Sequence, residues 1–109
     1  MLPGNMSAES SSVVAKRVAA ARERAAARLA GTTWRLNSEV PGTVLRRCFP
    51  PGTSARTILD RAVGLGQVSA RGADAAVRVA WSLADLSGTG RPGPDEVNQA
   101  IAMRTEAVR

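Results

Sequence analysis

The segment from Ser69 to Leu86 constrains the fold of this chain more than any other, because its apolar residues recur at helical spacing. Two apolar stripes follow that spacing, one of Ala73, Ala76, Val77, Ala80 and Ala84 and the other of Val79, Leu83 and Leu86. A helix that is apolar on two sides needs neighbours on both, so we expect this one to be central. Ser69 is the predicted N-cap, with Gly72 in place of the Glu or Gln of a capping box.

The rest of the chain repeats the helical pattern, and no segment alternates as a half-buried strand would. We expect helices over residues 13–29, 41–48 and 54–63, and a last helix from Pro94 or Asp95. One of the serines at 10–12 should cap the first helix, and Thr53 or Ser54 the third. Residues 1–12 then form a leading segment before a helical domain over 13–109. The predicted fold class is all-α, a small bundle of four or five helices.

The composition excludes several kinds of chemistry. The chain has 109 residues, which is one domain's worth, with no His and one Cys. A Ser-His-Asp triad, a His-ligated metal, a zinc cluster and an internal disulfide are therefore ruled out. A P-loop needs Gly-Lys-Ser/Thr, whereas Lys16, the single lysine, is followed by Arg17. We expect no catalytic residue and no metal site within this chain.

Other single residues carry weaker predictions. Cys48 is expected to be a small buried apolar residue, and Trp34 and Trp81 are expected to pack in the core. No apolar run is long enough to span a membrane, and residues 1–5 do not resemble a signal peptide. With a free cysteine as well, these features favour a cytoplasmic protein without membrane contact.

The net charge of +6 comes from 14 arginines, and its excess lies in the first 68 residues. A basic balance of this kind favours nucleic acid or another polyanion as a partner. The candidate DNA-binding residues are Lys16, Arg17, Arg24, Arg28, Arg46 and Arg47. An arginine-rich, alanine-rich composition also arises from a GC-rich coding sequence, and no aromatic residue interleaves the charges for base stacking.

Arg71 is the residue whose position most suggests chemistry. It should occupy the second position of its helix, where a cation meets the positive end of the helix dipole, at a typical cost of ~0.3–1 kcal/mol. A helix N-terminus also binds anions, and a guanidinium there could contact a phosphate. Asp74 lies one turn from both Arg71 and Arg78, so it could pair with either. A solvated Arg71 paired with Asp74 is the plainer interpretation.

Four sequence blocks together resemble the C-terminal helical domain of magnesium-chelatase-like AAA+ ATPases of the YifB/ComM type. The four blocks are Arg17 to Arg24, the pair Leu36-Asn37, Val68 to Leu86 and Glu96 to Arg104. The third block begins Val68-Ser69-Ala70-Arg71-Gly72 and ends Ala84-Asp85-Leu86. The resemblance covers roughly residues 8–105. Ala75 departs from it, since many members carry a second arginine there.

The resemblance implies that this chain is the lid of an ATPase whose α/β core lies outside it. Arg71 would be the sensor-2 arginine, with Arg78 as a second nucleotide-binding residue and Ser69 and Asp74 in support. ATP and Mg would bind through the core domain, and the isolated chain would hold no cofactor. The implied partners are that core and the neighbouring subunits of a hexamer, with DNA as a candidate, whereas the isolated domain should be a monomer and inert.

Two other functions stay open from the sequence. A stand-alone basic helical module would bind DNA through the arginines of the first helix, with an affinity that falls steeply as salt rises. A pure interaction module would instead use an exposed apolar stripe of that helix and would self-associate as its concentration rises.

Overall fold

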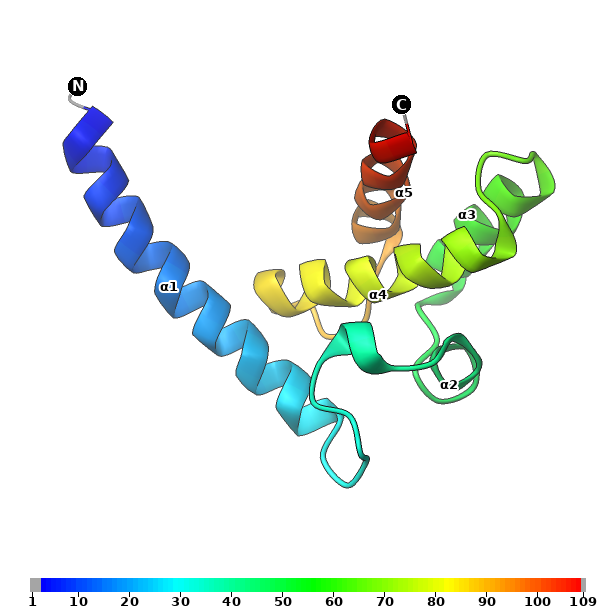
Figure 1. The fold of residues 1–109 in the computed structure, drawn as a ribbon, viewed down its shortest axis with the longest axis horizontal. Coiled ribbons are helices and arrows are strands. Elements are labelled where there is room, and N and C mark those ends of the chain that lie inside the picture. Colours follow the sequence, from blue (N-terminus) through cyan, green and yellow to red (C-terminus); the bar gives the residue numbers. More distant parts are fainter. Residues whose placement is uncertain (1–2, 109) are drawn as a thin grey trace.

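The computed structural model describes residues 3–108, and side chains over 11–104 (Figure 1). The described chain is helical throughout, without a strand, which confirms the predicted all-α class. Its elements are α1 (Pro3–Arg28), the 3-10 turn η1 (Asn37–Glu39), α2 (Gly42–Cys48), α3 (Thr53–Gly64), α4 (Ala70–Ser87) and α5 (Pro94–Val108).

Helix α4 is the spine of the fold, as its two apolar stripes predict. It contacts α1, η1, α2, α3 and α5 (Figure 1). Ser69 caps it as expected, because its Oγ accepts a hydrogen bond from the backbone N–H of Gly72 at 2.9 Å. Gly88, in the left-handed region with φ of 75°, ends the helix after its last turn. The predicted boundaries of this helix are therefore correct to one residue.

The core gathers around the buried side of α4. Each of the other four helices, or the residue just after it, contributes a buried side chain to this core: Leu29, Leu45, Leu59 and Val97. Trp81 is buried too, and its indole N–H donates to the backbone carbonyl of Phe49 at 3.0 Å. That bond satisfies the one polar atom of a large apolar side chain. The prediction that the tryptophans serve the core is confirmed, since Trp34 also packs against this cluster.

The predicted start of α1 is wrong, because the helix begins at Pro3 and runs through the serines at 10–12. Proline is well placed at a first helical position, where its missing N–H costs no hydrogen bond. The inner half of the expected apolar stripe is buried, at Ala21 and Ala25. Val13 and Val14 are about half exposed, and the first half of α1 extends away from the other helices (Figure 1).

Three local details around α2 and α3 also differ from prediction. Pro41 is the N-cap of α2 rather than its first residue, and Gly52, not Thr53 or Ser54, is the N-cap of α3. Cys48 is exposed. Its helix has only seven residues and turns Leu45 toward the core, with Phe49 following four positions later. Cys48 falls beside that inward face.

A short turn joins α1 to α2. The Glu39 carboxylate accepts hydrogen bonds from the backbone N–H groups of Arg35 and Leu36, at 2.8 and 2.9 Å. These two hydrogen bonds hold the pKa of Glu39 below its ordinary value, and the bond from Arg35 has the larger effect. The turn is thereby fixed beside α4, where it places Asn37.

Candidate functional site

Arg71 lies at the second position of α4, as the cap at Ser69 requires. It is exposed, and it forms no ion pair or side-chain hydrogen bond with another described residue. The charge therefore stands free at the positive end of a helix of 18 residues. The structure thus gives Arg71 no described partner that would account for its position.

Asp74 does not pair with Arg71 or Arg78, so the expected local pairing is wrong. Its carboxylate pairs instead with the guanidinium of Arg46, which comes from α2. It also packs over Gly42, where a Cβ would overlap the carboxylate. The partner lies 28 positions away in the sequence, so helical spacing within α4 could not predict it.

Arg78 differs from Arg71 although both lie on the polar edge of α4. It is half-buried, and its Nε donates to the backbone carbonyl of Val40 at 2.9 Å. That bond ties the middle of α4 to the residue just before the turn into α2. Arg78 therefore has an evident structural role, which Arg71 lacks.

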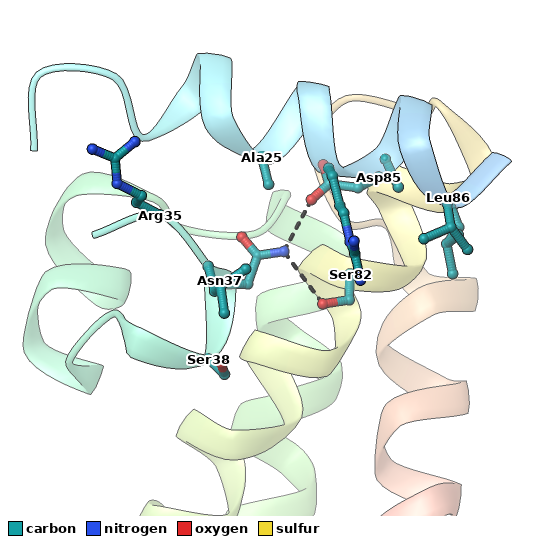
Figure 2. A pocket seen from close by; sticks show the side chains of 11 residues that line it. Ala25, Arg35, Asn37, Ser38, Ser82, Asp85 and Leu86 are labelled. Atoms are coloured by element: carbon teal, nitrogen blue, oxygen red, sulfur yellow. Dashed lines mark hydrogen bonds between the residues drawn. The ribbon is translucent and has the colours of Figure 1, made fainter. Parts of the chain in front are cut away.

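The densest polar cluster lies at the other end of α4, around Asp85. Arg28 binds this carboxylate with both terminal nitrogens, at 2.7 and 2.8 Å, and donates to Asn37 Oδ1 at 2.6 Å. The Asn37 amide donates to Asp85 Oδ2 at 2.9 Å and to Ser82 Oγ at 3.3 Å (Figure 2). The Arg28 guanidinium carbon also lies 4.0 Å from the centroid of the Trp81 ring. We call Arg28, Asn37, Trp81 and Asp85 the hub.

The hub joins the end of α1 and the turn that follows it to α4, which lies far along the sequence. Arg28 ends α1, Asn37 begins η1, and Asp85 comes from the last turns of α4. Arg24 reinforces it by donating to the backbone carbonyl of Asp85. The buried aspartate is thus fully compensated, and the angle at which α1 meets α4 is set by these directed bonds.

The six candidate DNA-binding residues differ in their surroundings in the structure. Arg28 belongs to the hub, Arg24 is bonded to Asp85, and Arg46 is paired with Asp74. Lys16 and Arg17 lie on α1, whereas Arg47 lies on α2. These three are exposed and have no ion pair among the described residues.

Among the hollows lined by described residues, two flank α4, and Arg71 lines neither of these two. One of about 380 Å³ lies between α1, η1 and α4 and is lined by Ala25, Leu36, Asn37, Asp85 and Leu86 among others (Figure 2). The other, of about 320 Å³, lies between α3 and α4 and has Arg46 and Asp74 on its wall. Across the described part of the chain, no cluster of three or more His, Cys, Asp or Glu could hold a metal ion. Nor is any helix there long and apolar enough to cross a membrane.

Sequence reasoning missed the two cross-helix pairs, although it named most of their members. Arg28 and Arg46 were grouped with the surface charges because both are arginines in a basic region. Asn37 and Asp85 were noticed as parts of sequence blocks, without a physical role. The sequence of α4 offers no signal that Asp85 is buried, because its spacing places it on the same polar edge as Asp74 and Arg78.

Comparison with known proteins gives a family match over nearly the whole chain. The sequence profile of the magnesium chelatase subunit ChlI C-terminal domain matches residues 8–104. An uncharacterized protein of Mycobacterium bovis is 48% identical over 101 residues, and an uncharacterized protein of Mycobacterium tuberculosis strain H37Rv has the same identity. The match covers 93% of this chain and 20% of each relative, so the chain spans about a fifth of their length. No solved structure matches it.

Proposed function

Since this chain belongs to the family of the magnesium chelatase ChlI C-terminal domain, we propose that it is the sensor-2 lid of an AAA+ ATPase. In this proposal a nucleotide-binding core supplies the ATP site, and the lid contributes Arg71 to it. The domain has no hydrolytic activity of its own. The location we propose is the cytoplasm.

The observation that carries this proposal is the free guanidinium of Arg71. Four helices and a turn pack around α4, and they leave this charge exposed at the N-terminal end of that helix. A cation there opposes the helix dipole, so the placement is unfavourable for the domain alone. A bound phosphate group would make the electrostatic energy of this arrangement favourable, because it would attract both the guanidinium and the helix N-terminus.

The residues of this domain fit part of an ATP-Mg site. Arg71 would contact a phosphate oxygen, with Ser69 holding the first turn of α4 in place through its cap. Bound ATP supplies the phosphoryl group that is transferred to water. In this proposal Mg would be held by the nucleotide-binding core together with the ATP phosphates. Arg71 would stabilise the negative charge that develops on the transferred group.

Arg78 and Asp74 would act behind Arg71 in this arrangement. Arg78 fixes α4 against Val40, and Asp74 fixes it against α2. Both keep the helix that presents Arg71 in one orientation. We therefore expect Arg78→Ala to lower turnover less than Arg71→Ala does.

The test is the steady-state ATPase rate of a protein that joins this domain to its nucleotide-binding core. Arg71→Ala should lower kcat by about 100- to 1,000-fold, as expected for loss of one preorganised transition-state contact. The matched control is Arg61→Ala, an exposed arginine of α3 without a described ion pair. Equal rates for the two variants would show that Arg71 has no sensing role.

The kind of motor is a finer part of the proposal. The sequence blocks resemble the ComM/YifB type, which points to a hexamer that remodels DNA. The alternative is a stand-alone DNA-binding module, in which Arg24, Arg28 and Arg46 would contact phosphates while also bonded within the fold. Duplex DNA binding by the 109-residue chain at low salt, lost steeply as salt rises, would favour that alternative.

A further inference from the structure

We propose that Arg46 is a positioning residue for Arg71: by holding Asp74 against α2, it keeps the Arg71 guanidinium unpaired. This inference rests on the proposed function for its importance in catalysis, but the placement itself is a property of this chain. It gives α2, which lies outside the expected phosphate contact, a role in that contact.

The first step is the position of Asp74 within α4. It lies three residues after Arg71, a spacing at which side chains on a helix meet. It is also the nearest acidic residue to Arg71 along α4, since the next one is Asp85. Asp74 is therefore the group most able to neutralise Arg71 from within the helix.

The second step is what holds Asp74 elsewhere. Arg46 pairs with its carboxylate, whose side chain is only 20% exposed. Gly42 leaves the space that the carboxylate fills, because any Cβ at this position would overlap it. The first turn of α2 is thus shaped to receive Asp74, and Arg46, one turn further along, completes the contact.

The third step is the state of Arg71 that results. With Asp74 turned toward α2, Arg71 has no ion pair among the described residues and remains exposed. Without Arg46, the carboxylate would be free to turn along α4 to Arg71 or to Arg78. Paired with Arg71, the carboxylate would neutralise the charge that a phosphate needs, and beside Arg78 it would still place a negative group nearer the phosphate, which like charges disfavour.

The direct test follows the Arg71 side chain by NMR in the 109-residue chain. Arg46→Ala should shift the Arg71 Nε–Hε resonance and raise its heteronuclear NOE, since a paired guanidinium moves less. Adding Asp74→Asn to that variant should return both to their original values. Arg61→Ala is the matched control and should leave Arg71 unchanged. An unaltered Arg71 signal in a folded Arg46→Ala variant would overturn the inference.

A second variant covers the case in which Arg46→Ala does not fold. Arg46→Gln keeps a polar side chain on α2 but removes the charge that pairs with Asp74. It should give the same change at Arg71 as Arg46→Ala. If Arg46→Gln is folded by circular dichroism and Arg71 still does not respond, the inference is wrong.

The functional arm uses a protein that joins the domain to its core. Arg46→Ala should lower kcat/KM for ATP by roughly three- to tenfold, within the range of coupling between neighbouring charged residues, and Arg46→Ala/Asp74→Asn should recover most of it. In an Arg71→Ala background, Arg46→Ala should have no further effect. A merely structural role for Arg46 would instead add its loss to that of Arg71→Ala and would contradict the inference.

The two proposals fail in different ways. If Arg71→Ala leaves ATP turnover unchanged, the sensor assignment is wrong, while the NMR result still decides whether Arg46 keeps Arg71 unpaired. If Arg71→Ala lowers turnover and Arg46→Ala alters neither turnover nor the Arg71 resonance, the sensor assignment stands and the role of Arg46 is refuted.

Discussion

The two arginine–aspartate pairs that brace α4 have the same chemistry and opposite surroundings. The pair of Arg28 and Asp85 is buried, with side chains 16% and 4% exposed, and Asn37 and Trp81 complete its shell. The pair of Arg46 and Asp74 is open, with the arginine 57% exposed. A buried pair is very costly to break, whereas an exposed pair contributes little free energy. The first therefore fixes the fold, and the second is suited to positioning a neighbouring group.

The largest expected effect is at the hub. Asp85→Ala would leave the Arg28 guanidinium buried without its counter-charge, so the free energy of unfolding should fall by about 3–5 kcal/mol. Urea denaturation of the 109-residue chain measures this change. Asp60→Ala, at an exposed position of α3, is the control and should change it little. A loss below about 1 kcal/mol at Asp85 would remove the contrast between the two pairs.

The next effect is at the N-cap of α4. Ser69→Ala removes the acceptor for the Gly72 N–H, and the expected loss of stability is about 1 kcal/mol. Ser69→Asp should restore most of it, because aspartate also caps and its charge suits the helix dipole. Thermal unfolding of the three proteins, followed by circular dichroism, distinguishes them. Similar stability of Ser69→Ala and the unaltered chain would show that the cap is not important for folding.

A smaller effect is expected at the open pair. Asp74→Ala should lower the free energy of unfolding by no more than about 1 kcal/mol, because its partner is largely exposed. The measurement is urea denaturation at low and at high salt, where the difference between variant and parent should shrink as salt rises. A loss as large as that of Asp85→Ala would mean that both pairs hold the fold.

The smallest effect should have the opposite sign. Arg71→Ala removes a cation from the positive end of α4, so the isolated domain should gain roughly 0.3–1 kcal/mol of stability. Careful comparison of urea midpoints would detect it. A destabilised Arg71→Ala chain would indicate that Arg71 serves the fold itself, which would weaken its assignment to a ligand outside the domain.

Local sequence rules predicted helix boundaries well where residues at the helix ends mark them. Ser69, Gly88 and Pro94 all mark boundaries that the structure shows. The rules failed at residues 3–12, where serines and glycine suggested a loop. The structure continues α1 through these ten residues because Pro3 can begin a helix, and the alanine-rich sequence that follows favours extension. Residues 1–2 of the expected leading segment lie outside the described residues.

The candidate site was only half predictable, and distance in the sequence explains why. The place of Arg71 on α4 follows from its spacing after Ser69. The partners of Asp74 and Asp85 lie 28 and 57 positions away, so no periodicity within α4 could show them. The exposure of Cys48 could not be predicted from the sequence either, because it depends on which side of a seven-residue helix packs against the core.

The hub and Arg71 lie near opposite ends of α4, so a rotation of this helix about the hub displaces Arg71. Fourteen positions separate Asp85 from Arg71, a distance of about 21 Å along the helix axis. A tilt of about 10° around the hub would therefore carry Arg71 through about 4 Å, which exceeds the length of a hydrogen bond. A small change in the angle between α1 and α4 would therefore move Arg71, relative to α1, by more than the length of a hydrogen bond.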